Sequence, residues 1–229
     1  MLRGDSVTRD MLADMIRSAV DDAVKSQTAR RAQEPPISTR VASTLEHRLD
    51  GATINGYRVT VVAQDFPDRG PGSWEHKSGA DLYIGIRVEA LIASFETSKG
   101  MLIQAKKARQ LSRARPRKGV SDDQQDLLDQ CEKMLRRTDK GAFVWVYSAG
   151  GTRVVPASEV LKLQVIPPEF LEGRNVAEQF RDVLDCFSGD TGLVAPDIFE
   201  NDFALGNFLE EIAVQRGVAI TLAPDERRT

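Results

Sequence analysis

The stretch SGADLYIGIRV (Ser78–Val88) alternates apolar residues with other residues from Leu82 to Val88, and MLIQAK (Met101–Lys106) alternates as well. This period of two predicts two β-strands, because successive side chains of a strand point to opposite faces. Asp81 stands at the start of the first strand, while Gln104 and Lys106, two residues apart, share one face of the second. The alternation therefore predicts a sheet that carries a carboxylate, an amide and an amine on neighbouring strands.

Helices and further strands are expected on either side of this pair. A first helix, at about residues 8–32, is expected to end at Glu34-Pro35-Pro36, because proline has no N–H and disfavours helix in the residue before it. The remaining predictions are helices at about 38–49, 121–138, 175–187 and 203–216, strands at 57–63, 142–147 and 153–156, and a short apolar stretch at 218–222.

The order of these elements predicts an α/β fold. Its core is a helix, a three-strand meander, a second helix and a strand, with extra helices at both termini. Residues 1–34 are expected to form an N-terminal helical extension, 35–166 the core, and 167–229 an acidic helical C-terminal region. In such a core, one face of the middle hairpin packs on helices and the other opens into a cleft, where Asp81 converges with Gln104 and Lys106.

The composition is that of a globular protein and limits the possible functions. The chain has 229 residues, of which 41% are hydrophobic and 28% charged. No apolar run approaches the roughly 20 residues that cross a bilayer, and the N-terminus lacks a signal-peptide pattern, so we expect a cytoplasmic protein without a membrane partner. Cys131 and Cys186 lack CxxC partners, so both are expected to be buried thiols. His47 and His76 lack the spacing of a zinc site.

Basic residues are concentrated next to the second strand. Between Lys99 and Lys118 there are eight lysines and arginines and no acid, although the net charge of the chain is −3. Such a segment either contacts nucleic-acid phosphates, without reading sequence, or is a solvated surface loop. The residues expected to bind DNA are Lys107, Arg109, Arg113, Arg115, Arg117 and Lys118.

The motifs Gly79-Ala80-Asp81 and Ile103-Gln104-Ala105-Lys106 resemble the Gly-Ala-Asp and Glu-x-Lys motifs of the PD-(D/E)xK nuclease superfamily, in its Mrr-like branch of bacterial defence nucleases. The resemblance covers roughly residues 38–147 and implies the restriction-endonuclease-like fold. This chain has Gln104 where the family more often has glutamate, although variants with Gln-x-Lys also occur there. The resemblance implies a Mg²⁺-dependent endonuclease that hydrolyses DNA in bacterial antiviral defence or restriction.

The resemblance also implies a role for each residue of the site. Asp81, Gln104 and Glu46, the last on the preceding helix, would bind Mg²⁺, for which Mn²⁺ is a substitute. Lys106 would position the attacking water and stabilise the anionic transition state. Glu75 is a further candidate ligand. Many relatives act as dimers, so a second copy, or a partner in a defence complex, is expected at the helical termini.

Plainer interpretations of the same residues stay open. Asp81 is also a suitable residue to cap a turn, and Gln104 and Lys106 are suitable for the solvent-facing side of an edge strand. Glu46 is equally suitable for a solvent-facing position on a helix. In addition, an amide oxygen binds Mg²⁺ less strongly than a carboxylate does. The alternative function is therefore a catalytically silent nucleic-acid-binding or protein-interaction subunit that retains the nuclease fold.

Overall fold

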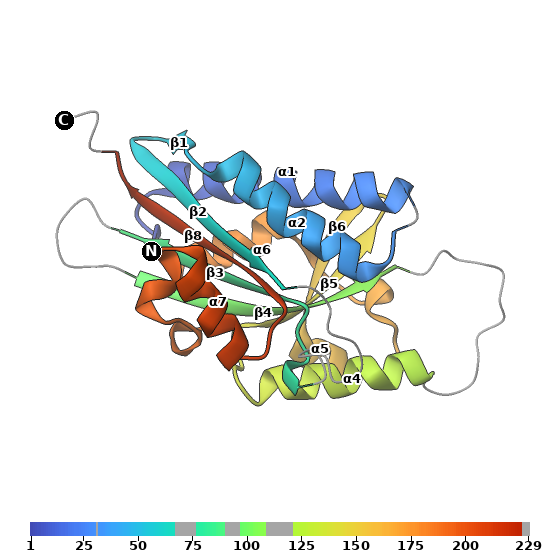
Figure 1. Cartoon of the computed structure of the whole chain (residues 1–229). Helices are drawn as coiled ribbons and strands as arrows, with labels where there is room; N and C mark the ends of the chain where they lie inside the picture. The colour runs from blue at the N-terminus through green and yellow to red at the C-terminus, as the bar shows by residue number, and fades with distance from the viewer. Residues whose placement is uncertain (31, 67–76, 90–96, 109–120, 226–229) are drawn as a thin grey trace.

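The computed structural model describes residues 1–30, 32–66, 77–89, 97–108 and 121–225. A mixed eight-stranded sheet runs through the molecule in the order β1-β2-β8-β3-β4-β5-β6-β7, and helices cover both of its faces (Figure 1). The α/β class predicted from the sequence is confirmed. The strands are β1 (Thr53–Ile54), β2 (Tyr57–Asp65), β3 (Leu82–Val88), β4 (Thr97–Lys107), β5 (Ala142–Ser148), β6 (Gly151–Pro156), β7 (Arg174–Asn175) and β8 (Arg216–Pro224).

The two stretches with alternating apolar residues form the antiparallel pair β3 and β4, in which Leu82 lies opposite Ile103. β4 then pairs in parallel with β5, because α4 (Asp122–Leu135) carries the chain back across one face of the sheet. Ser121 caps α4 by accepting a hydrogen bond from the backbone N–H of Gln124. The strands and the helix predicted in this part of the chain are confirmed.

One face of the sheet is covered by α1 (Ser6–Ala29), α2 (Glu34–Leu49) and α6 (Val176–Leu184), which share an apolar cluster with it. The start of α2 corrects the sequence prediction. Pro35 and Pro36 do not precede a helix that begins near residue 38 but lie in the first turn of α2, where the N–H that proline lacks has no helical partner.

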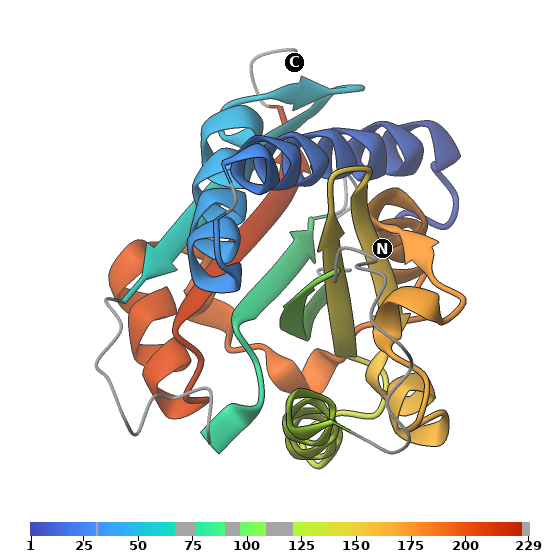
Figure 2. The same ribbon diagram turned by 90° about the vertical axis from the view of Figure 1, so that its right-hand side faces the viewer.

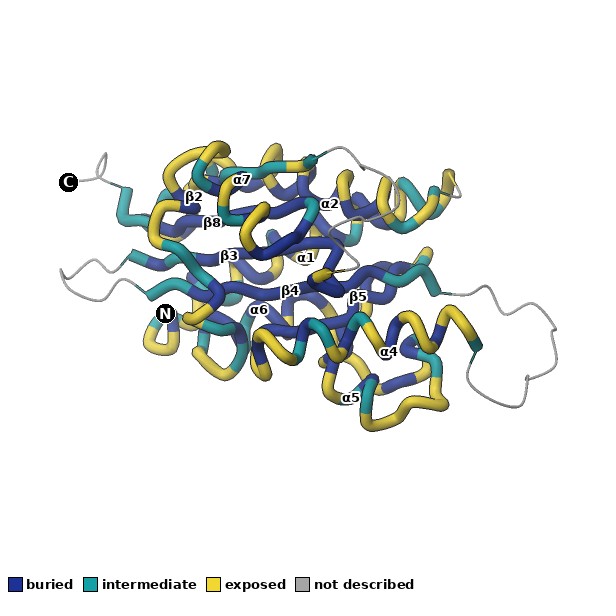
Figure 3. The backbone as a smooth tube through the Cα atoms, turned by 60° about the horizontal axis from the view of Figure 1, so that its bottom comes forward, coloured by how far each residue is buried: buried dark blue, intermediate teal, exposed yellow. Residues whose placement is uncertain are grey.

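The other face carries α4, α5 (Ala157–Lys162), α7 (Asp202–Glu211) and the short 3₁₀ helices Pro168–Phe170, Thr191–Leu193 and Pro196–Phe199, around a second apolar cluster. Figure 3 shows the central strands in the buried colour between these two layers. β3, β4, β5 and β8 therefore contribute side chains to both clusters. Among the described residues, no helix is long and apolar enough to span a membrane.

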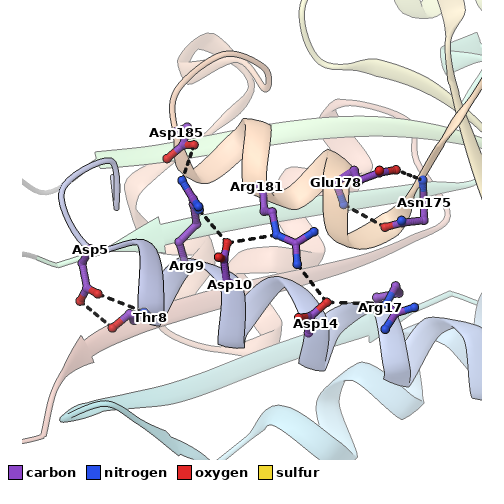
Figure 4. Close-up of polar contacts among 10 residues, drawn as sticks. All are labelled: Asp5, Thr8, Arg9, Asp10, Asp14, Arg17, Asn175, Glu178, Arg181 and Asp185. Atoms are coloured by element: carbon purple, nitrogen blue, oxygen red, sulfur yellow. Dashed lines mark hydrogen bonds and ion pairs between the residues drawn. The ribbon is translucent and has the colours of Figure 1, made fainter.

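Ion pairs tie α1 to α6 along their shared side (Figure 4). Arg9 contacts Asp10 at 2.9 Å and Asp185 at 2.7 Å, and Arg181 contacts Asp10 at 3.0 Å and Asp14 at 3.1 Å. The hydrogen bond from Arg9 lowers the pKa of Asp10. Because these side chains are partly exposed to water, the pairs fix the position of α1 on α6 more than they stabilise the fold.

The position of β8 overturns the predicted three-strand meander. β8 lies between β2 and β3, antiparallel to the first and parallel to the second. The predicted helix at 203–216 also ends early, at Glu211, and Arg216 begins the strand. The apolar stretch predicted at 218–222 is completely buried, so it occupies an inner position of the sheet, where both faces of a strand are covered.

Candidate functional site

Five strands bring their ends together at one end of the sheet, which faces the viewer in Figure 2. The registers place the start of β3 beside the ends of β4 and β5, and the start of β8 beside the end of β2. The first turn of α2 lies at the same end, where Glu34 accepts a hydrogen bond from the backbone N–H of Lys107 at 2.7 Å. The residues that the sequence singled out on β3 and β4 therefore belong to one region.

Asp81 and Gln104 are in direct contact. The amide Nε2 of Gln104 donates to Asp81 Oδ2 at 2.8 Å, and the backbone N–H of Ala105 donates to the same oxygen at 2.8 Å. Both side chains are enclosed, since Asp81 is 7% exposed and Gln104 is 0% exposed. Gln104 thus lies in the interior and not on the wet face of an edge strand.

The turn before Asp81 is fixed against α4. Gly79 has a φ of +76°, and a Cβ there would lie 2.2 Å from the carbonyl oxygen of Gln130. Only glycine allows this conformation and this approach together. The backbone N–H of Asp81 then donates to the carbonyl of Ile103 at 2.9 Å, so that Asp81 is tied to β4 through both its backbone and its side chain.

Lys106 points from β4 into a hollow of about 520 Å³ between α4 and the first turn of α2. It is half-buried, and no described residue forms a hydrogen bond or ion pair with its ammonium group. Among the described residues that line this hollow, Lys106 and Lys107 face four acids, Glu34, Asp123, Asp126 and Glu169. The described lining of the hollow therefore has more acids than bases, and Lys106 is its one lysine without a hydrogen bond or ion pair to a described residue.

The structure places Glu46 away from this site, which corrects its expected role. Glu46 is exposed and lies 12 residues beyond Glu34 on the same helix, or about 18 Å along its axis. The helix approaches the site with its N-terminal end, because its first turn lies at the end of β4. Glu34, which the sequence analysis did not select, is the helix acid at the site.

The predicted DNA-binding residues are only partly covered by the structure. Lys107 is held by the fold, since its Nζ donates to the carbonyl of Ala32 at 2.9 Å. The residues outside the described part of the chain are Arg109, Arg113, Arg115, Arg117 and Lys118, together with the candidate ligand Glu75 and with Trp74 and His76.

Arg216 and Tyr147 are neighbours of the site that sequence reasoning missed. Arg216 is 3% exposed; its Nη1 donates to the backbone carbonyl of Asp81 at 3.3 Å, and its Nε contacts Asp65 at 3.2 Å. The Tyr147 hydroxyl lies 3.2 Å from that of Ser38. Burial raises the pKa of Tyr147, and the charge of Asp81 raises it further. No local signal in the sequence indicates Arg216, because its burial depends on where β8 enters the sheet.

The cysteines and His47 lie outside the site, and the structure corrects one prediction about them. Cys131 is buried, and burial raises the pKa of its thiol to about 12. Cys186 is exposed, so the prediction that it is buried is wrong; it follows α6 with a φ of +67°, in a turn that leaves the core. His47 is exposed on α2. Within the described residues, no group of three or more His, Cys, Asp or Glu side chains is placed to hold a metal ion.

The donor set at Asp81 is nevertheless compatible with Mg²⁺, which commonly binds one or two carboxylates and takes its other ligands from water and substrate phosphates. Asp81 supplies the carboxylate. Gln104 presents its amide nitrogen to Asp81, so a half-turn of the amide is needed to place its oxygen there. Asp81 and Gln104 would then hold the ion, while Glu46 is too distant to take part.

Comparisons of this chain with protein-family models, with curated proteins and with solved structures gave no match.

Proposed function

We propose that the protein is a metal-dependent endonuclease that hydrolyses phosphodiester bonds of DNA. The observation that carries the proposal is the contact between Asp81 and Gln104, with Lys106 two residues further along the same strand. Two of these polar groups are enclosed at the ends of adjacent strands, and the third lines a hollow beside them. Turn capping does not account for a buried carboxylate and amide in contact, followed two residues later by an amine that has no partner among the described residues.

The chemistry divides among these groups as follows. A bound Mg²⁺ or Mn²⁺ supplies Lewis acidity toward the phosphoryl oxygens and lowers the pKa of a water molecule. Asp81 would anchor such an ion, and Gln104 would offer its amide oxygen after the half-turn. Lys106, with no other partner among the described residues, places a positive charge where the phosphorane-like transition state gathers negative charge. Arg216 holds the backbone carbonyl of Asp81 and so maintains the position of the anchor.

Gln104 allows the site to assemble without an ion. A glutamate at this position would set two carboxylates within hydrogen-bond distance, an arrangement that requires a proton or a cation. The amide instead donates to Asp81 at 2.8 Å. We therefore expect metal binding to be weaker than at a site with two carboxylates, and to depend on the phosphate oxygens that the substrate brings.

The sequence resemblance extends this proposal to a biological setting. It supports a role in bacterial antiviral defence or restriction, with a second copy or a complex partner bound near the helical termini. A catalytically silent DNA-binding or protein-interaction subunit is the alternative function. The hydrogen bond that satisfies Asp81 without a metal favours this alternative.

Cleavage of supercoiled plasmid and linear duplex DNA with Mg²⁺ or Mn²⁺ tests the proposal. The informative variants are Asp81→Asn and Lys106→Ala, and Glu46→Gln is the matched control because Glu46 is an exposed acid on α2. We expect metal-dependent cutting that falls about 100-fold or more in the first two variants and is unchanged in the control. Each variant is first compared with the wild type by thermal unfolding, so that a loss of fold is not taken for a loss of activity.

Two results contradict the proposal. DNA retention without cutting under either metal would support the silent binding module. Cutting that survives Asp81→Asn would show that contaminating or different chemistry is responsible.

A further inference from the structure

A second hollow lies on the other side of the first turn of α2, and we call it the α2–β8 hollow. It is an open hollow of about 710 Å³ between that turn and the adjoining ends of β2 and β8. Its polar lining includes Thr39, Arg40 and Ser43 from α2, Asp65 from β2, and Arg216 from β8. The hollow therefore adjoins the candidate site without using Asp81, Gln104 or Lys106.

Arg216 connects the hollow to the site. Its guanidinium is enclosed, with 4% of the side chain exposed, and it bonds both Asp65 and the backbone carbonyl of Asp81. An arginine has five N–H donors, so these two contacts leave it able to donate to further partners. A ligand seated against Arg216 is thus directly behind the residue proposed to anchor the metal.

Arg40 supplies a second positive charge at the mouth of the hollow. It is exposed, and no described residue forms an ion pair or a side-chain hydrogen bond with its guanidinium. Asp65 is the one acid among the described lining residues, and it is already paired with Arg216. The described lining therefore carries two arginines and one acid, a net charge of +1.

The described linings of the two hollows differ in the sign of their net charge. Beside Lys106, the described lining carries two lysines and four acids, a net charge of −2. A phosphate is therefore attracted to the described lining of the α2–β8 hollow, whereas beside Lys106 it would need a bound metal ion to offset the acids. Arginine also matches the geometry of phosphate oxygens better than lysine does.

From these observations we infer that the α2–β8 hollow binds a backbone phosphate of the DNA, adjacent to the phosphate that is cut. This inference rests on the proposed nuclease function. Arg40 contacts the phosphate directly, while Arg216, whose charge is offset by Asp65, offers its remaining N–H donors from behind. The strand then crosses the first turn of α2 to reach Asp81 and Lys106, so the hollow positions the substrate without contributing to the chemistry.

Fluorescence anisotropy with a labelled duplex of about 20 base pairs tests the inference, in EDTA so that nothing is cut. The variants are Arg40→Ala, Arg40→Lys and the control Arg136→Ala, which removes an exposed arginine at the far end of α4. Arg216 itself is not replaced, because its burial makes misfolding the expected result.

We expect Arg40→Ala to weaken binding about five- to tenfold and to reduce the slope of log K against log salt by about 1, as for one lost phosphate contact. Arg40→Lys should keep most of the slope, and Arg136→Ala should match the wild type. Equal binding by Arg40→Ala and Arg136→Ala, with the wild type bound, overturns the inference and leaves the nuclease proposal standing. If the wild type does not bind duplex DNA even at low salt, the proposed function and the inference both fail.

Discussion

Replacing Gln104 with glutamate should make the stability of the protein depend on divalent metal. In the wild type, Gln104 donates to Asp81 at 2.8 Å within an enclosed site. The substitution Gln104→Glu removes that donor and sets a second carboxyl group against the first. Two negative charges about 3 Å apart repel each other by about 5–6 kcal/mol at an effective dielectric constant of about 20.

Proton uptake limits that cost. In the unfolded chain the pKa of a glutamate carboxyl group is about 4.3. Keeping that group protonated costs about 1.4 kcal/mol for each pH unit above this pKa, or about 4 kcal/mol at pH 7. Because this is less than the repulsion, the introduced group should be protonated in the folded state, with a raised pKa. The folded variant then binds more protons than the unfolded chain, so its stability rises as the pH falls. The loss of folding free energy relative to the wild type should therefore shrink to about 1 kcal/mol at pH 5.

Thermal unfolding in EDTA and in a Mn²⁺ or Mg²⁺ series measures this effect. A loss of about 4 kcal/mol lowers Tm by roughly 8–16 °C in a chain of this size. Divalent metal should reverse the decrease, because a cation between two carboxylates replaces the proton. The control is Gln179→Glu, a buried glutamine on α6 that accepts a hydrogen bond from Trp145, which should lose stability without rescue by metal.

Two outcomes would refute this reasoning. One is a Gln104→Glu variant as stable as the wild type in EDTA at pH 7, which would mean that Asp81 and Gln104 are not in contact. The other is equal metal rescue of both glutamate variants, which would mean that the metal binds elsewhere.

Two further predictions concern the surroundings of the site. Gly79→Ala should lower the free energy of unfolding by about 2–4 kcal/mol in urea, because the new Cβ would meet the Gln130 carbonyl at a positive φ, whereas Gly4→Ala, with open space around it, should change stability little. In the folded protein a thiol reagent should modify the exposed Cys186 quickly. Cys131 should react only after denaturation, because burial raises the pKa of its thiol to about 12. Rapid modification of both thiols would contradict the position of Cys131 in the core.

The parts of the fold that follow from local patterns were predictable from the sequence. The alternation from Leu82 to Val88 predicts β3 with its observed bounds, because a period of two is a property of the strand itself. The contact between Asp81 and Gln104 followed from the same pattern, since a hairpin brings the start of one strand beside the end of the next.

The errors arose where distant segments meet. No local feature shows that β8 enters between β2 and β3, because strand order depends on pairing between residues more than 100 positions apart. Arg216 was consequently assigned to a helix end. The position of Glu46 on the helix before the strands predicts a place at the site, but the end of α2 that approaches the site is set by how the helix packs on the sheet.

The insertion of β8 changes how the site is held together. Asp81 is bonded to β4 through Ala105 and Gln104, and to β8 through Arg216, so three strands are joined at one residue by bonds additional to their ladders. A site fixed in this way holds Asp81 in place before any ligand arrives, which reduces the ordering cost on binding. The parts that adjust are the amide of Gln104, which turns to face a metal, and the side chain of Lys106, which has no partner among the described residues. The substrate should therefore order Lys106 while leaving Asp81 where it is.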